Sequence, residues 1–185
     1  MRATACLLSI LVLAPLSACS TNPVTGRSQF MIVSEQEAIS QSAEAYSSLI
    51  GQMQRQGKLS DDAALRARVE TITNRVVRQA VRYRPETARW SWQMQVIESP
   101  DVNAFCMAGG KMAVYTGLIE KVRPSDDELA QVIAHEIAHA LSNHTAEKMS
   151  VAQASQLGAA VLGAVAQSRG LPIGGSETQL LATVG

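Results

Sequence analysis

The segment 126–149 constrains this chain more than any other, because a clear helix start precedes all of its histidines. Ser125 and Glu128 have the spacing of a capping box, in which each side chain bonds the backbone of the other. Asp126 and Asp127 place negative charge at the positive end of the helix dipole. We predict one continuous helix over 126–149. It carries all three histidines of the chain within ten residues: His135, His139 and His144.

Two of these histidines have the spacing of metal ligands. Helical geometry places His135 and His139 about 40° apart around the axis and one turn along it, so both rings can reach one ion. Glu136 lies about 100° round from His135, where its carboxylate could take a proton from water. The pattern predicts a zinc site for metal-assisted hydrolysis, with His135 and His139 as ligands and Glu136 as base. The competing interpretation is two histidines on a helix face beside a glutamate.

Three further helices are expected. A capping box at Ser34 and apolar residues at helical spacing predict a helix over 34–53. A second helix begins near residue 60 and carries an apolar stripe on one side and arginines mostly elsewhere. The segment 152–166 is uncharged and rich in Ala, Val and Leu, and we expect a buried or closely packed helix there.

The pattern between these helices has the period of strands. Over 90–96, apolar and polar residues alternate, which predicts a strand with one buried face. The dipeptide Gly109-Gly110 accepts the positive φ angles of a tight turn, so 104–108 and 111–116 are predicted to form a hairpin. The predicted fold class is therefore α+β, mainly helical, with a small antiparallel sheet beside the histidine-bearing helix.

The first residues have the features of an export signal. Residues 1–18 contain an arginine followed by a short apolar run, the charge order and length of a secretory signal. The run ends in Leu16-Ser17-Ala18-Cys19, which resembles the lipobox of bacterial lipoproteins, whose cysteine is acylated. Ser20, rather than aspartate, follows it, which in enteric-type lipoproteins implies the outer membrane. We expect 19–33 to be a lipid-anchored tether that is extended over Ser20–Arg27; the competing interpretation is an ordinary cleaved signal with a chance cysteine.

Charge and cysteine usage exclude several classes of function. The net charge of +0 gives no reason to expect a polyanionic partner such as nucleic acid, and no segment reaches bilayer-spanning length. Cys6 would leave with the signal and Cys19 would be acylated, so only Cys106 remains as a thiol and no intramolecular disulfide can form. The apolar neighbours Phe105 and Met107 indicate that Cys106 is a small buried residue rather than a nucleophile.

Five stretches carry a family resemblance that runs in order through most of the mature chain. They are Asn22-Pro-Val-Thr-Gly-Arg27, Val102-Asn-Ala-Phe105, Gly109-Gly-Lys111, Val114-Tyr-Thr-Gly-Leu118 and Glu128-Leu-Ala-Gln-Val-Ile-Ala-His-Glu-Ile-Ala-His139. In these stretches the chain resembles the bacterial lipoprotein branch of metallopeptidase family forty-eight, relatives of the HtpX and CAAX prenyl peptidases.

The resemblance implies a gluzincin-like fold and a set of site residues. Zinc would be held by His135 and His139, with Glu136 as base, on a helix beside a small sheet. An edge strand of that sheet would receive an extended peptide by strand addition, which explains broad recognition through the substrate backbone. The residues expected to contact substrate are Asn103, Ala104, Gly109 and Gly110.

The chain departs from this family at the third zinc ligand. Family members take it from a glutamate on a later helix, usually within a Glu-Ala-Asp segment, and the sequence contains no such segment. Glu177 follows a glycine-rich loop and could swing in, whereas Glu147 is poorly directed. On a continuous helix His144 lies about 140° round from His139, so it should face away from the ion and pack near the helix end. We therefore expect the metallopeptidase domain, 34–185, to be C-terminally incomplete.

These features predict a zinc metalloendopeptidase with one zinc per chain, anchored at the outer membrane of a Gram-negative cell and facing the periplasm. Its expected substrates are unfolded or misassembled envelope polypeptides, in protein quality control. The alternative, from another class, is a non-catalytic, chaperone-like lipoprotein that binds clients and keeps only a weak two-histidine metal site.

Overall fold

The computed structural model describes residues 19–168, which fall into two compact units. The larger unit is Glu35–Thr145, and the smaller unit combines the described residues before and after it. The predicted signal sequence, residues 1–18, and the candidate ligand Glu177 lie outside the described residues.

The larger unit contains the helices predicted before the sheet. The first of these, α2, covers Glu35–Arg55, and the second, α3, covers Ala63–Tyr83, so both are confirmed to within a few residues. Asp62 caps α3, because its carboxylate accepts the backbone N–H of Ala64 at 2.9 Å and of Leu65 at 3.0 Å. The remaining helices of this unit are the 3₁₀ helix η2 (Pro85–Arg89), α4 (Thr116–Val122) and α5 (Asp126–Leu141).

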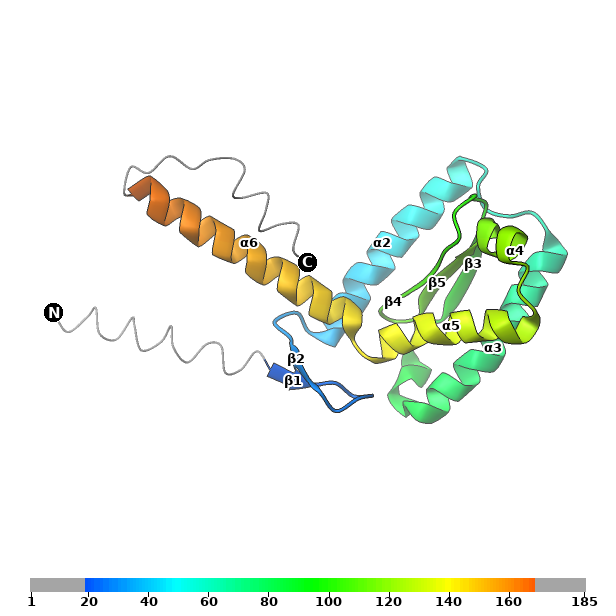
Figure 1. Ribbon diagram of the computed structural model, residues 1–185, viewed down its shortest axis with the longest axis horizontal. Coiled ribbons are helices and arrows are strands. Elements are labelled where there is room, and N and C mark those ends of the chain that lie inside the picture. The colour runs from blue at the N-terminus through cyan, green and yellow to red at the C-terminus, as the bar shows by residue number, and fades with distance from the viewer. Residues whose placement is uncertain (1–18, 169–185) are drawn as a thin grey trace. The chain divides into compact units, whose positions relative to one another are not determined.

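The sheet of the larger unit has three strands in the order β3-β5-β4 (Figure 1). The strands are β3 (Gln93–Ile97), β4 (Ala104–Met107) and β5 (Lys111–Tyr115). The predicted hairpin is confirmed, since β4 and β5 are antiparallel. The prediction of an antiparallel sheet is wrong for β3, which pairs parallel to β5. The chain leaves β3, passes to the far edge to form β4, and the hairpin then brings β5 into the space between them.

The turn between β4 and β5 requires glycine at two positions. Gly109 and Gly110 have φ values of +77° and +78°, a region that residues with a Cβ rarely adopt. A Cβ on Gly110 would lie 2.4 Å from Cε3 of Trp92. Gly110 therefore allows both the turn and the close packing of the Trp92 ring on it.

We expect Gly110→Ala to lower the free energy of unfolding by about 2–4 kcal/mol, from left-handed strain and overpacking against Trp92. The matched control is Gly57→Ala, because Gly57 also has positive φ (+63°) but a Cβ there meets nothing within 4 Å. The control should lose only about 1–2 kcal/mol from strain. Equal losses in urea denaturation of the two variants would show that the contact with Trp92 contributes nothing.

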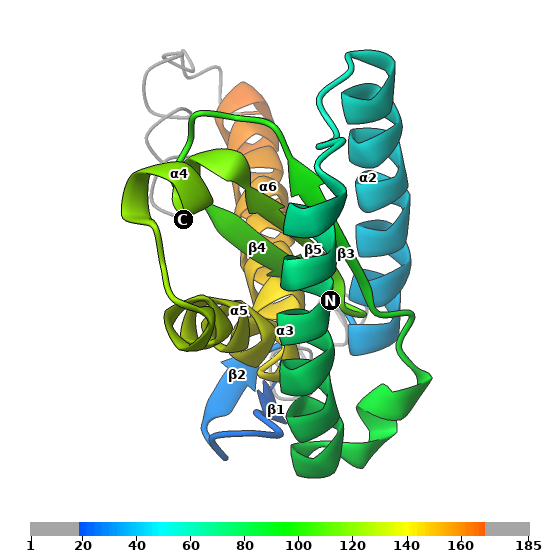
Figure 2. The ribbon, with the colours of Figure 1, turned by 90° about the vertical axis from the view of Figure 1, so that its right-hand side faces the viewer.

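The core of the larger unit lies between the sheet and the helices that pack on it. Helix α5 packs against α3 and against β4 (Figure 2). Tyr46 of α2 is buried and its hydroxyl donates to the carbonyl of Met112 at 2.9 Å, and burial raises the pKa of Tyr46 to about 12. Apolar side chains fill this core: Val69, Ile72, Val96, Ile97, Met112, Ala113, Val114, Leu118, Leu129, Ile133 and Ile137. The predicted α+β class is confirmed.

The continuous helix predicted over 126–149 is wrong, because α5 ends at Leu141 and a new helix, α6 (His144–Ser168), begins three residues later. Between them Asn143 adopts a left-handed conformation with φ of +56°. A residue in this conformation ends a helix, and asparagine tolerates it better than other residues with a Cβ. His144 is therefore oriented by the turn, not by the periodicity of α5.

The smaller unit begins with a hairpin of β1 (Cys19–Thr21) and β2 (Ser28–Phe30). The buried side chain of Asn22 holds its turn by accepting the backbone N–H groups of Val24 at 2.8 Å and Thr25 at 2.9 Å. The expected extended conformation is therefore wrong for the segment after Cys19, because local hydrogen bonds fold it back. The lipid anchor itself stays a prediction.

The part of α6 that belongs to the smaller unit is bonded to the hairpin segment. Glu147 accepts hydrogen bonds from Arg27 and Gln29, and the Ser150 hydroxyl accepts the backbone N–H groups of Ile32 at 3.1 Å and Val33 at 2.9 Å. These contacts join segments about 120 residues apart in sequence.

Beyond this contact α6 carries apolar side chains at the surface. We expected a buried or closely packed helix over 152–166, and this is wrong for four of its larger side chains, which are 42–62% exposed: Leu157, Val161, Leu162 and Val165. Apolar composition alone does not bury a helix unless another element packs on it. Among the described residues, none of the helices is both long and apolar enough to cross a bilayer.

Candidate metal centre

Arginines hold α5, the helix with the candidate ligands, near both of its ends. At its start Arg68 of α3 donates to the Asp126 carboxylate and to the carbonyl of Pro124, both at 2.7 Å. The predicted capping box is confirmed: the Ser125 hydroxyl accepts the Glu128 N–H at 3.3 Å, and the Glu128 carboxylate accepts the Ser125 N–H at 2.8 Å. The Ser125 backbone N–H and hydroxyl both donate to the Glu128 carboxylate and lower the pKa of Glu128.

At the other end Arg84, which follows α3, is buried and donates to the carbonyl of Leu141 at 2.8 Å. Its guanidinium also binds both carboxylate oxygens of Glu35, at 2.7 and 2.9 Å, and Glu86 at 2.8 Å, and it lies over the Trp90 ring. Burial opposes the charge of Arg84, but Glu86 and Glu35 raise its pKa above the usual value. Sequence reasoning missed Arg84, since nothing in its local pattern distinguishes it from the exposed arginines before it.

Burial of one face of α5 sets the direction of the two candidate ligands. Leu129, Ile133 and Ile137 are buried, so His135 and His139 lie on the exposed side. Their rings are nearly perpendicular, with centroids 4.6 Å apart, and their Nε2 atoms are 3.1 Å apart. The predicted convergence of the two rings on one point is therefore present.

This pair fits two positions of a zinc site. Tetrahedral zinc with Zn–N bonds of about 2.0–2.1 Å separates two nitrogen ligands by about 3.4 Å. The observed 3.1 Å between the Nε2 atoms of His135 and His139 requires only a slight opening of the rings to admit the ion. His135 and His139 as the metal ligands stay a prediction.

A third ligand is not found in the part of the chain that the structure describes. Within residues 19–168, no three side chains of His, Cys, Asp or Glu gather closely enough to hold a metal ion. Glu147 is bonded to Arg27 and Gln29, and Glu177 lies outside the described residues. The described residues therefore offer His135 and His139 as the two predicted ligands of the candidate site.

The predicted base, Glu136, is half-buried and faces the sheet. Its side chain lines a narrow gap between α5 and the sheet together with Ala104 and Phe105 of β4. Strand β4 is an edge strand, and in the observed antiparallel register the backbone N–H and C=O groups of Ala104 and Cys106 point away from β5. The carboxylate of Glu136 thus lies beside a strand edge to which an extended peptide could add.

The four residues expected to contact substrate are separated by the structure. Ala104 lies beside Glu136, and Asn103 next to it accepts the Ala104 N–H through its own side chain at 2.9 Å. Gly109 and Gly110 are instead buried at the turn, where a Cβ on Gly109 would lie 2.9 Å from the side chain of Ile39. The two glycines have a structural role in the turn; substrate contact stays a prediction for all four residues.

The structure bears out the interpretation of Cys106 as a buried residue. Its side chain is 8% exposed. Burial, and to a lesser extent the nearby charge of Glu136, raises the pKa of its thiol far above the usual value.

We expect Cys106 to react with iodoacetamide on the order of 100-fold more slowly in the folded protein than in urea, since the thiolate is the reactive form. Mass spectrometry of the Cys106 peptide measures both rates; comparable rates would contradict the burial.

The angle of 140° predicted for His144 on a continuous helix is wrong, whereas it does pack near the end of α5. Because α5 stops at Leu141 and Asn143 breaks the helix, His144 lies against His139, with their Nδ1 atoms 2.6 Å apart and ring centroids 4.9 Å apart. It therefore contacts the side of the His139 ring opposite to His135. An Asn two residues after the last apolar residue of α5 is the sequence signal that could have revealed the turn.

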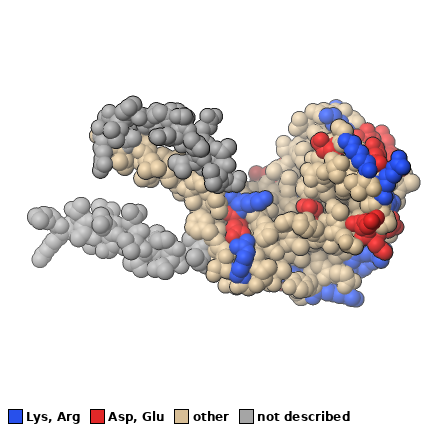
Figure 3. Space-filling view, viewed as in Figure 1, with Lys and Arg blue, Asp and Glu red and all other residues tan. Residues whose placement is uncertain are grey.

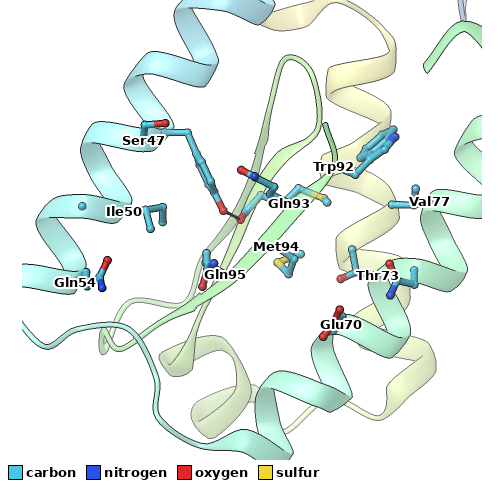
Figure 4. Close-up of a pocket in the computed structure, with 14 residues that line it drawn as sticks. Ser47, Ile50, Gln54, Glu70, Thr73, Val77, Trp92, Gln93, Met94 and Gln95 are labelled. Atoms are coloured by element: carbon cyan, nitrogen blue, oxygen red, sulfur yellow. Dashed lines mark hydrogen bonds between the residues drawn. The ribbon is translucent and has the colours of Figure 1, made fainter. Parts of the chain in front are cut away.

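A separate groove of about 580 Å³ lies between α2 and α3 over β3 (Figure 4). The figure shows Gln54, Gln93 and Gln95 with Glu70 and Trp92 around this space. None of the histidines or Glu136 lines it. On the face in Figure 3, acidic and basic side chains are intermixed over the larger unit.

Comparison with known proteins identifies the family. The profile of Peptidase family M48 matches residues 63–182, about two thirds of the chain. The chain belongs to this family. The match includes α5 with its histidines and extends past the described residues.

Three relatives illustrate the similarity. Metalloendopeptidase OMA1, mitochondrial, of Bos taurus is 31% identical over 130 residues, which cover 70% of this chain and 24% of that protein. The β-barrel assembly-enhancing protease of Yersinia pestis is 29% identical over 104 residues, 56% of this chain and 20% of that protein. Metalloprotease LoiP of Escherichia coli (strain K12) is 38% identical over 87 residues, 46% of this chain and 32% of that protein. The chain thus spans less than a third of the length of each.

Proposed function

We propose that this M48 protein is a zinc-dependent metalloendopeptidase. The observation that carries the proposal is the 3.1 Å approach of the Nε2 atoms of His135 and His139 on the exposed side of α5, with Glu136 beside the free edge of β4. The names of the relatives, two metalloproteases and a β-barrel assembly-enhancing protease, support the same chemistry.

Each residue has a separate task in this proposal. His135 and His139 hold the ion as neutral imidazoles and do not cancel its charge. Zinc, when bound, would lower the pKa of a water molecule to about 7 and polarise the scissile carbonyl. Glu136 takes the proton of the attacking water and returns it to the departing amine. The outward C=O group of Ala104 and the outward N–H and C=O groups of Cys106 hold the substrate backbone as an added strand.

The proposed substrates are unfolded or misassembled polypeptides of the bacterial envelope. Recognition through backbone groups on β4 selects extended chain, which folded proteins do not present. The proposed location is the outer membrane, facing the periplasm, with Cys19 as the lipid-bearing residue. The lipobox-like Leu16-Ser17-Ala18-Cys19 supports the anchor. Incorporation of labelled palmitate that is lost in Cys19→Ala, followed by fractionation of the two membranes, tests it.

The enzyme proposal is tested by zinc content and cleavage in the full chain. Equimolar zinc, and casein cleavage that a chelator abolishes and added zinc restores, are the expected results. Weak zinc binding without cleavage would refute the enzyme and support the client-binding lipoprotein. Suppression of casein aggregation without cleavage would then identify the chaperone-like activity.

A further inference from the structure

His139 stands between two other imidazoles. On one side its Nε2 atom lies 3.1 Å from Nε2 of His135, and on the other its Nδ1 atom lies 2.6 Å from Nδ1 of His144. The separation of 2.6 Å between two ring nitrogens requires a proton between them, since two lone pairs would repel at this distance. The contact between His139 and His144 is therefore a hydrogen bond whose direction depends on the tautomers.

The direction of that bond decides whether His139 can bind a metal. A neutral imidazole has one N–H and one lone pair, so His139 offers Nε2 to an ion only when its proton is on Nδ1. Nδ1 of His139 must then donate, and Nδ1 of His144 must accept. The opposite direction would put the proton of His139 on Nε2 and block the metal.

We propose that His144 is a positioning residue of the metal centre: its Nδ1 accepts the Nδ1–H of His139, fixing the tautomer and the ring orientation of that ligand. The proposal rests on the proposed zinc peptidase function. The second ring nitrogen of a metal-binding histidine needs a hydrogen-bond acceptor. In this fold His144, the first residue of α6, supplies that acceptor to His139. His144 cannot itself be a ligand of the same ion while its Nδ1 contacts the far side of His139.

The fold fixes His144 through the turn before it. Asn143, at φ of +56°, ends the helical conformation after α5, and Arg84 donates to Leu141 O at 2.8 Å and to Asn143 Oδ1 at 3.4 Å. His144 itself is half-buried, so its ring is restricted in the position that meets His139. The acceptor is thus built into the larger unit and does not depend on the metal.

Two variants of His144 distinguish its role as a hydrogen-bond acceptor from its role in packing. His144→Leu fills a similar space with an apolar side chain and removes the hydrogen-bond acceptor. His144→Asn places its Oδ1 where Nδ1 of the histidine was and so keeps an acceptor. We expect His144→Leu to weaken zinc affinity by about 10–100-fold, the usual cost of losing a partner of a metal ligand, and His144→Asn to recover most of it. Competition with a chromophoric chelator measures the affinities in the full chain, and thermal unfolding of the metal-free proteins checks that both variants fold.

The tautomer supplies a readout that needs no metal. In the metal-free protein, at a pH above the titration of imidazole, ¹⁵N spectra should show His139 protonated at Nδ1 and His144 at Nε2. In His144→Leu the Nδ1–H form of His139 should lose population. His139 protonated at Nε2 in the wild type, or equal zinc affinity in wild type and His144→Leu, would overturn the proposal. A wild type without any zinc binding would instead refute the proposed peptidase function.

Discussion

Glu136→Gln is expected to lower the rate of casein cleavage by about 10²–10⁴-fold, the usual loss when a general base is removed. Gln has almost the same shape, so its packing against Ala104 and Phe105 should persist. It cannot accept a proton from the attacking water, however, and the lost step is the one assigned to the carboxylate. Because Glu136 is assigned proton transfer and not metal binding, zinc affinity should change by only a few-fold.

Cleavage rates at saturating substrate, with chelator competition for zinc affinity, measure the two effects separately. The matched control is Glu120→Gln, the same chemical change at an exposed position of α4, which should leave both quantities unchanged. Cleavage by Glu136→Gln at the wild-type rate would remove Glu136 from the mechanism. Loss of zinc together with cleavage would show that the carboxylate supports the metal rather than the proton transfer.

Arg84→Met is expected to lower the free energy of unfolding by about 1–3 kcal/mol, the usual cost of leaving a buried hydrogen-bonding group without its partner. The Arg84 side chain is only 8% exposed, and its removal leaves the carbonyl of Leu141 without this donor and Glu35, whose side chain is 30% exposed, with only the 3.4 Å contact from Asn143. The effect should extend to the metal centre, because the same guanidinium holds the end of α5 from which His144 is positioned.

Urea denaturation of the metal-free protein measures this loss. Arg82→Met, an exposed arginine two residues earlier, is the control and should change stability by about 0.5 kcal/mol or less. Arg84→Lys keeps the charge but not the planar guanidinium, whose three nitrogens bond Glu86, Leu141 and Glu35 at the same time, so it should lose an intermediate amount. A loss in Arg84→Met no larger than in Arg82→Met would show that the buried ion pair does not stabilise α5.

The elements that were predictable are those specified by residues close together in the chain. The start of α5 follows from Ser125 and Glu128, which are three residues apart and cap the same turn. The convergence of His135 and His139 follows from their i, i+4 spacing on that helix. The hairpin follows from Gly109-Gly110, since only a tight turn uses two positive φ values in succession.

The errors arose where distant segments decide the outcome. The parallel pairing of β3 with β5 depends on where the hairpin returns, which the alternation of residues along one strand does not encode. The end of α5 was placed too late, because the stop depends on the Asn143 turn and on Arg84, which bonds Leu141 from 57 residues away. The exposure of α6 likewise depends on which element packs on it, not on its composition.

The order of residues along the chain specifies the helix that carries the candidate centre and the two histidines that meet on it, because contacts within one or two turns are set by spacing alone. The contact of His144 with His139 and the position of Glu136 beside β4 depend on the fold. They follow from the turn at Asn143 and from packing between segments far apart in the chain, and the free energies of those long-range contacts are not encoded in any local pattern.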